Sequence, residues 1–386
     1  MGGVVANACD LVPLFAFWIS VAVLTYTFFG YGLLIAAIAR WRPRPLSNPG
    51  AGASLPSLAV VLIAHNEEHQ IAARLQNLLS CEYPAEKLRI LVVSDGSTDS
   101  TIIRAEAIRD PRIEVIVQTE RAGKAAGLNL AVTRCREEIV VFTDARQRFA
   151  PDAIRRLATH FTDPEMGAVS GALEIAAATS TAGAGVDAYW RYEKFLRAAE
   201  SRVDSCIGCT GAIYALRRTL FSPIPEDTLI DDVVIPMGAA VQGARVIHDP
   251  LARASDPQPL ESAAERRRKQ RTLAGGFQML FRHPAWLLPW RNRLWWQLIS
   301  HKYLRLVAPA FLLTAFGANL ALASRPFYAF CLAAQSVFYA CAAGGSLPRA
   351  TRLRMFALPA GFVFLNLQAV RGFVYYVARR GGGGWK

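Results

Sequence analysis

Short apolar runs that end on polar residues recur along the first half of the chain. Residues 58–64, 88–93 and 139–143 are almost entirely apolar, and polar side chains follow each run directly. A short apolar run of this kind is typical of a strand that is buried on both faces, as in a parallel sheet. Because ligands of such sheets gather at the carboxyl ends of the strands, we expect the chemistry where these runs stop.

Segments with helical spacing separate these runs. We predict, in chain order, strand 58–64, helix 68–80, strand 88–93, helix 99–108, strand 113–117, helix 124–134, strand 139–143, helix 152–161 and strand 167–175. This alternation predicts an α/β domain with a mostly parallel sheet and right-handed crossovers.

The following part of the chain predicts further elements on the same sheet. We expect an amphipathic helix over 186–203, a strand over 210–216, a helix that ends near Val241 and a short strand over 244–247. A charged helix over 261–270 should then end at the glycines Gly275 and Gly276, since glycine disfavours helix interiors.

Long uncharged runs flank this block. Residues 11–39 carry no charge, and neither do 306–324, 326–348 and 355–370. The first run exceeds the ~20 residues that cross a hydrocarbon core at 1.5 Å per residue. The composition agrees, because 53% hydrophobic and 19% charged residues are unusual for a soluble protein.

We therefore expect an integral membrane protein with a polar block between its spans. The expected parts are a transmembrane helix over 11–39, a linker over 40–56, a catalytic domain over 57–282, a tryptophan-rich interfacial helix over 284–300 and a transmembrane region with about three apolar segments over 304–378.

Charged residues beside the spans predict the orientation. Arg40, Arg42 and Arg44 follow the first span, whereas Asp10 precedes it, so the positive-inside rule places the central block in the cytoplasm of a multi-pass inner-membrane protein. The loop 349–354 agrees. The basic tail 379–386 agrees only if the last apolar run is re-entrant or interfacial. A cleaved signal peptide is the alternative for the first run, but no basic residue precedes it.

The net charge of +13 suits an anionic ligand and membrane-facing arginines. We expect no nucleic-acid partner, because no motif supports one. Cys206 and Cys209 form a single CxxC pair without a second pair, so we interpret them as buried small residues and not as a zinc or redox site.

Asp144 is the first candidate for chemistry, because it directly follows the run 139–143. A carboxylate there can hold a divalent cation that shares oxygens with a phosphate. Such motifs usually have a second carboxylate, but Arg146 stands in its place and could contact phosphate directly. An ordinary capping aspartate is the alternative.

Two further motifs follow the other strands. Asp95 and Asp99 flank Gly-Ser-Thr before a predicted helix, where carboxylates suit a nucleobase or ribose as well as helix capping. Lys124 follows Gly123 and could bring an ammonium group to a pyrophosphate. Asp231 and Asp232 introduce the helix that ends near Val241, where they could cap it or supply a base.

In this order, the motifs resemble those of the family 2 glycosyltransferases, in particular membrane-embedded members similar to cellulose, chitin and hyaluronan synthases. The resemblance covers about residues 58–281 and the flanking spans. It implies a GT-A fold and inverting transfer from a nucleotide sugar, such as a UDP-sugar, to a lipid or growing glycan acceptor. It also implies Mg²⁺ or Mn²⁺ as cofactor.

The resemblance also implies roles for single residues. Asn66, Glu67 and Asp95 would border the nucleoside, and Lys124 would border the ribose or the phosphates. Asp144 would contact the metal-bound diphosphate. Asp232, the second member of its acidic pair, would be the general base.

The chain departs from the family pattern in two places. The metal motif has Arg146 in place of its second aspartate, and the Gln-x-x-Arg-Trp signature of processive synthases is replaced near Gln270 and Arg271. The basic residues around Gln270, which are Arg267, Arg268, Lys269 and Arg271, could still clamp a leaving diphosphate. The tryptophan that would stack an acceptor sugar is missing, so processivity does not follow. A non-catalytic scaffold or polysaccharide-export component with the same fold is the alternative, and it would tolerate the loss of Asp232.

Overall fold

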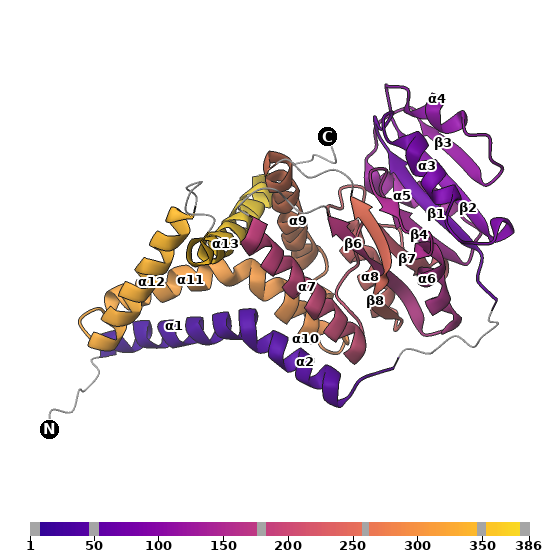
Figure 1. Ribbon diagram of the computed structural model, residues 1–386. Helices are drawn as coiled ribbons and strands as arrows, with labels where there is room; N and C mark the ends of the chain where they lie inside the picture. The colour runs from indigo at the N-terminus through magenta and orange to yellow at the C-terminus, as the bar shows by residue number, and fades with distance from the viewer. Residues whose placement is uncertain (1–7, 46–53, 176–182, 257–261, 346–352, 379–386) are drawn as a thin grey trace.

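The computed structural model describes residues 8–45, 54–175, 183–256, 262–345 and 353–378. A sheet with its covering helices lies at one end of the molecule, and four long apolar helices lie at the other (Figure 1). Two helices, α7 (Gly183–Val203) and α9 (Ser262–Arg282), lie between these two parts.

The sheet contains eight strands in the order β3-β2-β1-β4-β7-β6-β8-β5. Its first half is parallel and consists of β1 (Leu58–Ala64), β2 (Leu88–Asp95), β3 (Ile113–Gln118) and β4 (Ile139–Thr143). This confirms the parallel sheet predicted from the apolar runs. The carboxyl ends of these strands meet at one edge, as expected.

The second half of the sheet is mixed. Strand β7 (Ile213–Arg217) runs antiparallel to β4 and to β6 (Met166–Ile175), and β8 (Arg245–Asp256) is parallel to β6. Strand β8 is much longer than the predicted strand 244–247, because its second half pairs with Ala172 to Ile175 beyond a bulge. The two-residue β5 (Arg148–Phe149) pairs with it and was not predicted.

Helices cover both faces of the sheet. Alternate residues of β1 point to opposite sides: Leu58, Val60 and Leu62 pack with α3 (Ile71–Leu79) and α6 (Ala153–Thr159). Ala59 and Val61 pack with α5 (Lys124–Arg134) and α8 (Asp231–Val241) on the other face. The short α4 (Thr101–Glu106) follows β2. A strand buried on both sides accounts for the unbroken apolar runs.

Within the described residues, four stretches are long and apolar enough to cross a membrane: 11–41, 295–321, 326–344 and 355–378. The first consists of α1 (Ala8–Thr25), a π-turn (Tyr26–Gly30) and α2 (Tyr31–Trp41). The others contain α11 (Leu304–Ala321), α12 (Pro326–Gly344) and α13 (Arg354–Ala378). The last stretch has 24 residues, longer than the 16-residue run seen in the sequence, because the helix continues past Arg371.

The predicted end of the charged helix is wrong. Helix α9 does not end at Gly275 and Gly276 but continues to Arg282. A Cβ at Gly275 would lie 2.6 Å from Ile230 Cγ2, and one at Gly276 would lie 3.0 Å from Leu306. These glycines therefore permit close packing inside the helix, and tertiary contact overrides their low helix propensity.

The interfacial helix expected over 284–300 is also not a single helix. A 3₁₀ turn (Pro284–Leu287) is followed by a turn, and helical structure resumes only with α10 (Trp295–Gln297) and a π-turn (Leu298–Tyr303). Asn292 causes the break: its side chain donates to the Trp286 carbonyl at 2.9 Å and accepts from the Leu294 amide at 2.9 Å.

Candidate active site

A charged cluster lies at the carboxyl edge of the parallel strands. The Lys124 Nζ lies 3.0 Å from Asp144 Oδ1 and 3.3 Å from Asp231 Oδ2. Lys124 is the first residue of α5, Asp144 follows β4, and Asp231 begins α8. The fold thus brings together three predicted site residues that span more than 100 positions of the chain.

Asp232 lies beside this cluster. Its main-chain carbonyl accepts from the Cys209 amide at 2.7 Å, and a Cβ at Gly211 would lie 3.0 Å from its Oδ2. Burial and the neighbouring Asp231 carboxylate raise the pKa of Asp232 to about 6, whereas Lys124 and Arg197 oppose this shift. A carboxylate with a raised pKa is suited to accept a proton near neutral pH.

Lys124 remains charged in this setting. Burial lowers the pKa of a lysine, but the carboxylates of Asp144, Asp231 and Asp232 outweigh it and raise the pKa of Lys124 above its ordinary value. The cluster therefore holds a fixed ammonium group between two carboxylates, next to a third one.

Asp95 positions this lysine. Its carboxylate is buried and accepts from the amides of Ala122 and Gly123 at 2.7 Å and 3.0 Å. Gly123 has a φ of +95°, a conformation that favours glycine. Asp95 thus fixes the loop from which Lys124 projects. The sequence predicted Asp95 as a neighbour of a nucleoside, and its oxygens already bind the protein backbone.

The other residues predicted for the nucleoside lie around the same turn. Asn66, which has a φ of +55°, accepts from the Thr98 amide at 2.9 Å, and the Glu67 amide donates to Thr101 Oγ1 at 2.7 Å. Asp99 Oδ1 accepts from the Thr101 amide at 3.0 Å. Burial and the nearby Asp144 carboxylate raise the pKa of Glu67, so Glu67 lies within electrostatic range of the cluster.

Arg146 already has a partner. Its Nη2 lies 2.5 Å from Oδ2 of the buried Asp256 at the end of β8. The turn around it is held by Arg148, whose Nη1 donates to the carbonyls of Ala145, Arg146 and Gln147 at 3.0 to 3.2 Å. The buried Arg74 contacts the end of β4, directly before this turn, because its Nη2 donates a 2.7 Å hydrogen bond to Thr143 Oγ1. The sequence predicted neither Asp256 nor Arg74.

Gln270 and Arg271 lie on α9, which packs against α13. Gln270 Nε2 donates to the carbonyl of Arg371 at 3.4 Å. One turn further along α9, Gly275 packs on Leu229 and Ile230, directly before the acidic pair. Gln278 Oε1 accepts from the Leu229 amide at 3.0 Å, so α9 is attached to the segment that leads into α8.

A divalent cation would find limited protein ligands here. Asp144 offers a carboxylate whose side chain is 43% exposed. Within the described ranges, no group of three or more His, Cys, Asp or Glu side chains is arranged to hold a metal ion. One carboxylate fits a cation that takes its remaining oxygens from a diphosphate and water.

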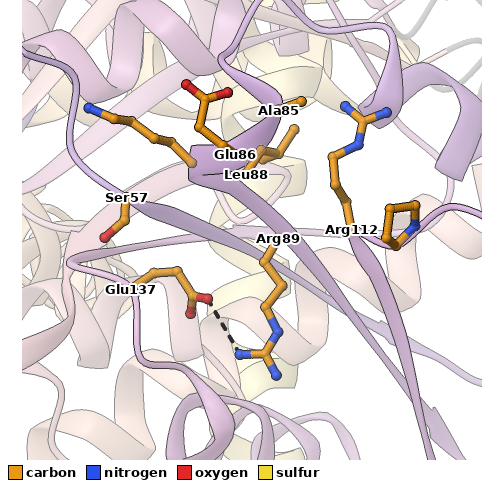
Figure 2. Close-up of a pocket in the computed structure, with 9 residues that line it drawn as sticks. Ser57, Ala85, Glu86, Leu88, Arg89, Arg112 and Glu137 are labelled. Carbon is orange, nitrogen blue, oxygen red and sulfur yellow. Dashed lines mark hydrogen bonds and ion pairs between the residues drawn. The ribbon is translucent and has the colours of Figure 1, made fainter.

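A pocket of about 390 Å³ lies at the opposite edge of the sheet, where the strands begin. Ser57, Leu88 and Arg112 line it, together with Arg89 and Glu137, which form an ion pair (Figure 2). This pocket is separate from the charged cluster, because Asp144 directly follows the carboxyl end of β4 and Lys124 comes after the carboxyl end of β3.

Comparison with known proteins agrees with the fold. The family model for glycosyl transferase family 2 matches residues 59–223. An N-acetylglucosaminyltransferase of Bradyrhizobium elkanii is 30% identical over 127 residues, which cover 32% of this chain and 69% of the relative. A beta-monoglucosyldiacylglycerol synthase of Synechocystis sp. (strain ATCC 27184 / PCC 6803 / Kazusa) is 28% identical over 176 residues, 41% and 37% of the two chains.

Among solved structures, the mannosyltransferase PcManGT from Pyrobaculum calidifontis, in complex with GDP-Man and Mn²⁺, is similar over most of its length. The TM-score is 0.68 at 25% identity, and the match covers 92% of this chain and 99% of that structure. By contrast, the chain spans about half the length of the N-acetylglucosaminyltransferase of Rhizobium meliloti (strain 1021), to which it is 31% identical.

Proposed function

We propose that this chain, which belongs to glycosyl transferase family 2, moves a sugar with inversion from a nucleotide-sugar donor to a lipid or glycan acceptor at a membrane surface. The observation that carries this proposal is the Lys124 ammonium group held between Asp144 and Asp231, with Asp232 beside it. Inverting transfer needs a base at the acceptor hydroxyl and positive charge at the departing nucleotide.

Asp232 is the general base of this proposal. In its ionised form it removes the proton of the acceptor hydroxyl as the oxygen attacks the anomeric carbon and the bond to the nucleotide breaks. The turn at Gly211 lies directly against its carboxylate, which limits the positions that this carboxylate can take. Asp231, bound to Lys124, orients the start of α8.

Lys124 serves the donor side. An ammonium group stabilises the negative charge that develops on the leaving diphosphate, and a preorganised charge in a partly dry site is effective in this role. We assign Gln270 and Arg271 to the same diphosphate. Arg271 lies one turn before the contact of α9 with Leu229 and Ile230. Asn66, Glu67 and Asp99 would border the nucleoside, with Asp95 fixing the loop of Lys124.

Asp144 would hold a divalent cation, Mg²⁺ or Mn²⁺. The cation would neutralise part of the diphosphate charge when it is bound. PcManGT, the similar structure, contains Mn²⁺ together with GDP-Man. The protein itself contributes the exposed Asp144 carboxylate and keeps Arg146 within the same turn.

The acceptor would arrive from the membrane. Helices α7 and α9 lie between the sheet and the four apolar helices (Figure 1), which supports a reaction close to a lipid surface. A related synthase is named for a diacylglycerol product, which supports a lipid acceptor. A UDP-sugar is the donor that the sequence predicts.

The direct test is sugar transfer by the full-length protein in lipid nanodiscs. The purified protein is incubated with radiolabelled UDP-glucose, UDP-N-acetylglucosamine or GDP-mannose and a bacterial lipid extract, and organic and aqueous products are separated. We expect label from one donor in an extractable lipid or in a glycan. If no donor is hydrolysed or transferred, the chain is a scaffold that keeps the fold.

Metal and nucleotide should bind with positive coupling. Because Asp144 is the single carboxylate of the turn, the cation depends on the diphosphate for further oxygens, and each ligand raises the affinity of the other by the same factor. Titration calorimetry of UDP and GDP with and without Mn²⁺ measures this factor. Tight binding of Mn²⁺ without nucleotide would contradict the prediction.

The same titration on Arg146→Ala separates two roles of that arginine. A charge-assisted contact with phosphate is worth ~1.5–3 kcal/mol, so its loss should weaken nucleotide binding by about 10- to 100-fold. Unchanged affinity would mean that Arg146 only holds Asp256 in place. Arg156→Ala, which breaks a surface ion pair with Asp152, is the matched control.

The sheet domain should face the cytoplasm, because the basic residues that flank membrane spans are found mostly on the cytoplasmic side. A cysteine at the exposed Glu106 should escape an impermeant thiol reagent in intact cells, whereas one at the exposed Ser324, between α11 and α12, should react. Both should react after the membrane is opened. Labelling of the Glu106 site in intact cells would reverse the proposed topology.

A further inference from the structure

Helix α7 connects the apolar helices to the turn that holds Asp232. It packs against α2 and α13 on one side and against β8 on the other (Figure 1). Along its second half it carries three charged side chains that the protein largely buries: Glu193, Arg197 and Glu200. Buried charges need partners, and the identity of these partners indicates what the helix does.

Glu193 is surrounded by basic side chains from the π-turn Leu298–Tyr303 and from the start of α11. Its carboxylate lies 2.9 Å from His301 Nε2, 3.0 Å from Lys302 Nζ and 3.1 Å from Arg305 Nη1. Burial alone would raise the pKa of Glu193, but these basic side chains hold it well below its ordinary value. Glu193 therefore stays ionised and ties α7 to the membrane segment 295–321.

Glu200, two turns later, makes a second junction. Its Oε1 accepts from the Tyr31 hydroxyl of α2 at 2.5 Å and lies 2.7 Å from His301 Nδ1. Its Oε2 accepts from the Ile207 amide at 3.3 Å. His301 thus bridges both glutamates, and Glu200 reaches from the membrane helices to the turn after α7.

Arg197 makes the link toward the acidic pair. Its Nε lies 3.4 Å from Glu193 Oε1, and its Nη1 donates to Thr210 Oγ1 at 3.0 Å. Thr210 belongs to the turn between α7 and β7. Within this turn, Gly208 has a φ of +80°, and Cys209 donates its amide to the Asp232 carbonyl.

The turn is in direct contact with the proposed base. A Cβ at Gly208 would lie 2.9 Å from Val233, and one at Gly211 would lie 3.0 Å from Asp232 Oδ2. Backbone and carboxylate are therefore closely packed, and a displacement of Thr210 would displace Asp232. The path runs from Glu193 through Arg197 and Thr210 to the base.

We propose that Arg197 is a positioning residue for the transfer reaction: anchored by Glu193 to the membrane segment, it holds the turn 208–211 against Asp232. The inference rests on the proposed role of Asp232 as base. It assigns a second task to the apolar helices, because they fix the partner of Arg197 in addition to anchoring the domain.

The test is steady-state kinetics of the full-length protein in nanodiscs. Arg197→Gln should lower kcat by roughly 10- to 100-fold, since small displacements of a catalytic group have effects of this size. The KM for the donor should stay within about twofold, because the partners that the described part of the chain gives Arg197, Glu193 and Thr210, are not assigned to the nucleotide. Arg197→Lys keeps the charge and should recover part of kcat. Arg202→Gln, an exposed position on the same helix, is the control.

A second variant avoids the risk that Arg197→Gln unfolds the protein by leaving Glu193 with fewer partners. Thr210→Val removes the hydroxyl that Arg197 contacts, keeps the shape of the side chain and changes no charge. It should lower kcat in the same direction with unchanged nucleotide affinity. If Thr210→Val and every folded Arg197 variant keep kcat within twofold of the wild type, the positioning role is overturned.

Asp232→Asn separates this inference from the proposed function. An inactive Asp232→Asn together with fully active Arg197→Gln and Thr210→Val would remove the positioning role alone. An active Asp232→Asn would remove the base on which both rest.

Discussion

Asp232→Asn should abolish sugar transfer while nucleotide binding persists. The amide has almost the shape of the carboxylate but cannot accept the proton of the acceptor hydroxyl, and a positioned base contributes typically ~10²–10⁴-fold to the rate. The residue lies against Gly211 and beside the Lys124 cluster, so the substitution leaves the donor side in place. The rate is measured with saturating donor and acceptor, and binding of the nucleoside diphosphate by calorimetry.

Glu226→Gln is the matched control, because this exposed carboxylate precedes the same helix. It should leave the rate unchanged. If Asp232→Asn keeps most of its activity in correctly inserted protein, the base must be another group, and Asp231 is then the first candidate.

The pH dependence gives a second measurement of the same group. The base works when it is deprotonated, so kcat should fall as the pH falls through the pKa of Asp232, which is about 6. Lys124 and Arg197 lower this pKa. Loss of either charge should therefore move the acid limb to higher pH. A rate that does not change between pH 5 and pH 8 would contradict the assignment.

Lys124→Met should cause the other large loss. The ammonium group is the fixed positive charge of the cluster, and removal of one preorganised group of this kind costs ~10²–10³ in kcat. The substitution also leaves Asp144 and Asp231 without the cation that separates them. Both the rate and the affinity for the nucleoside diphosphate should therefore fall.

Lys194→Met serves as the control for Lys124→Met, since Lys194 is exposed on α7. Excess Mn²⁺ should recover part of the nucleotide affinity of Lys124→Met, because a cation at Asp144 replaces part of the lost charge. Wild-type affinity and rate in Lys124→Met would mean that the lysine only balances its two carboxylates.

Local patterns determine much of the sheet and of the site. Apolar runs such as Ile139–Thr143 are typical of central strands that are buried on both faces, and the carboxyl ends of parallel strands lie at one edge of the sheet. The order of runs and polar residues along the chain is therefore enough to predict that Asp144 and Lys124 lie at the same edge. Uncharged runs of transmembrane length likewise predict the four long apolar helices that the structure contains.

The course of α9 does not follow from its own residues. Gly275 and Gly276 indicate a helix end by local propensity, but Ile230 and Leu306 pack against them and the helix continues. The long pairing of β8 and the break at Asn292 also depend on distant partners.

Charge pairing likewise depends on the tertiary structure. The sequence does not reveal that Arg146 contacts Asp256 or that Arg197 contacts Thr210, because only the fold brings these residues together. The Arg197–Glu193 pair is local, since the two residues lie four positions apart on one helix. Hydrophobic periodicity repeats within a few residues and can be recognised locally, whereas the ion pair of Arg146 and Asp256 depends on two side chains that lie 110 positions apart. Local sequence thus specifies the elements and the edge where the chemistry lies, and the packing of distant segments selects the charges that hold the proposed base in position.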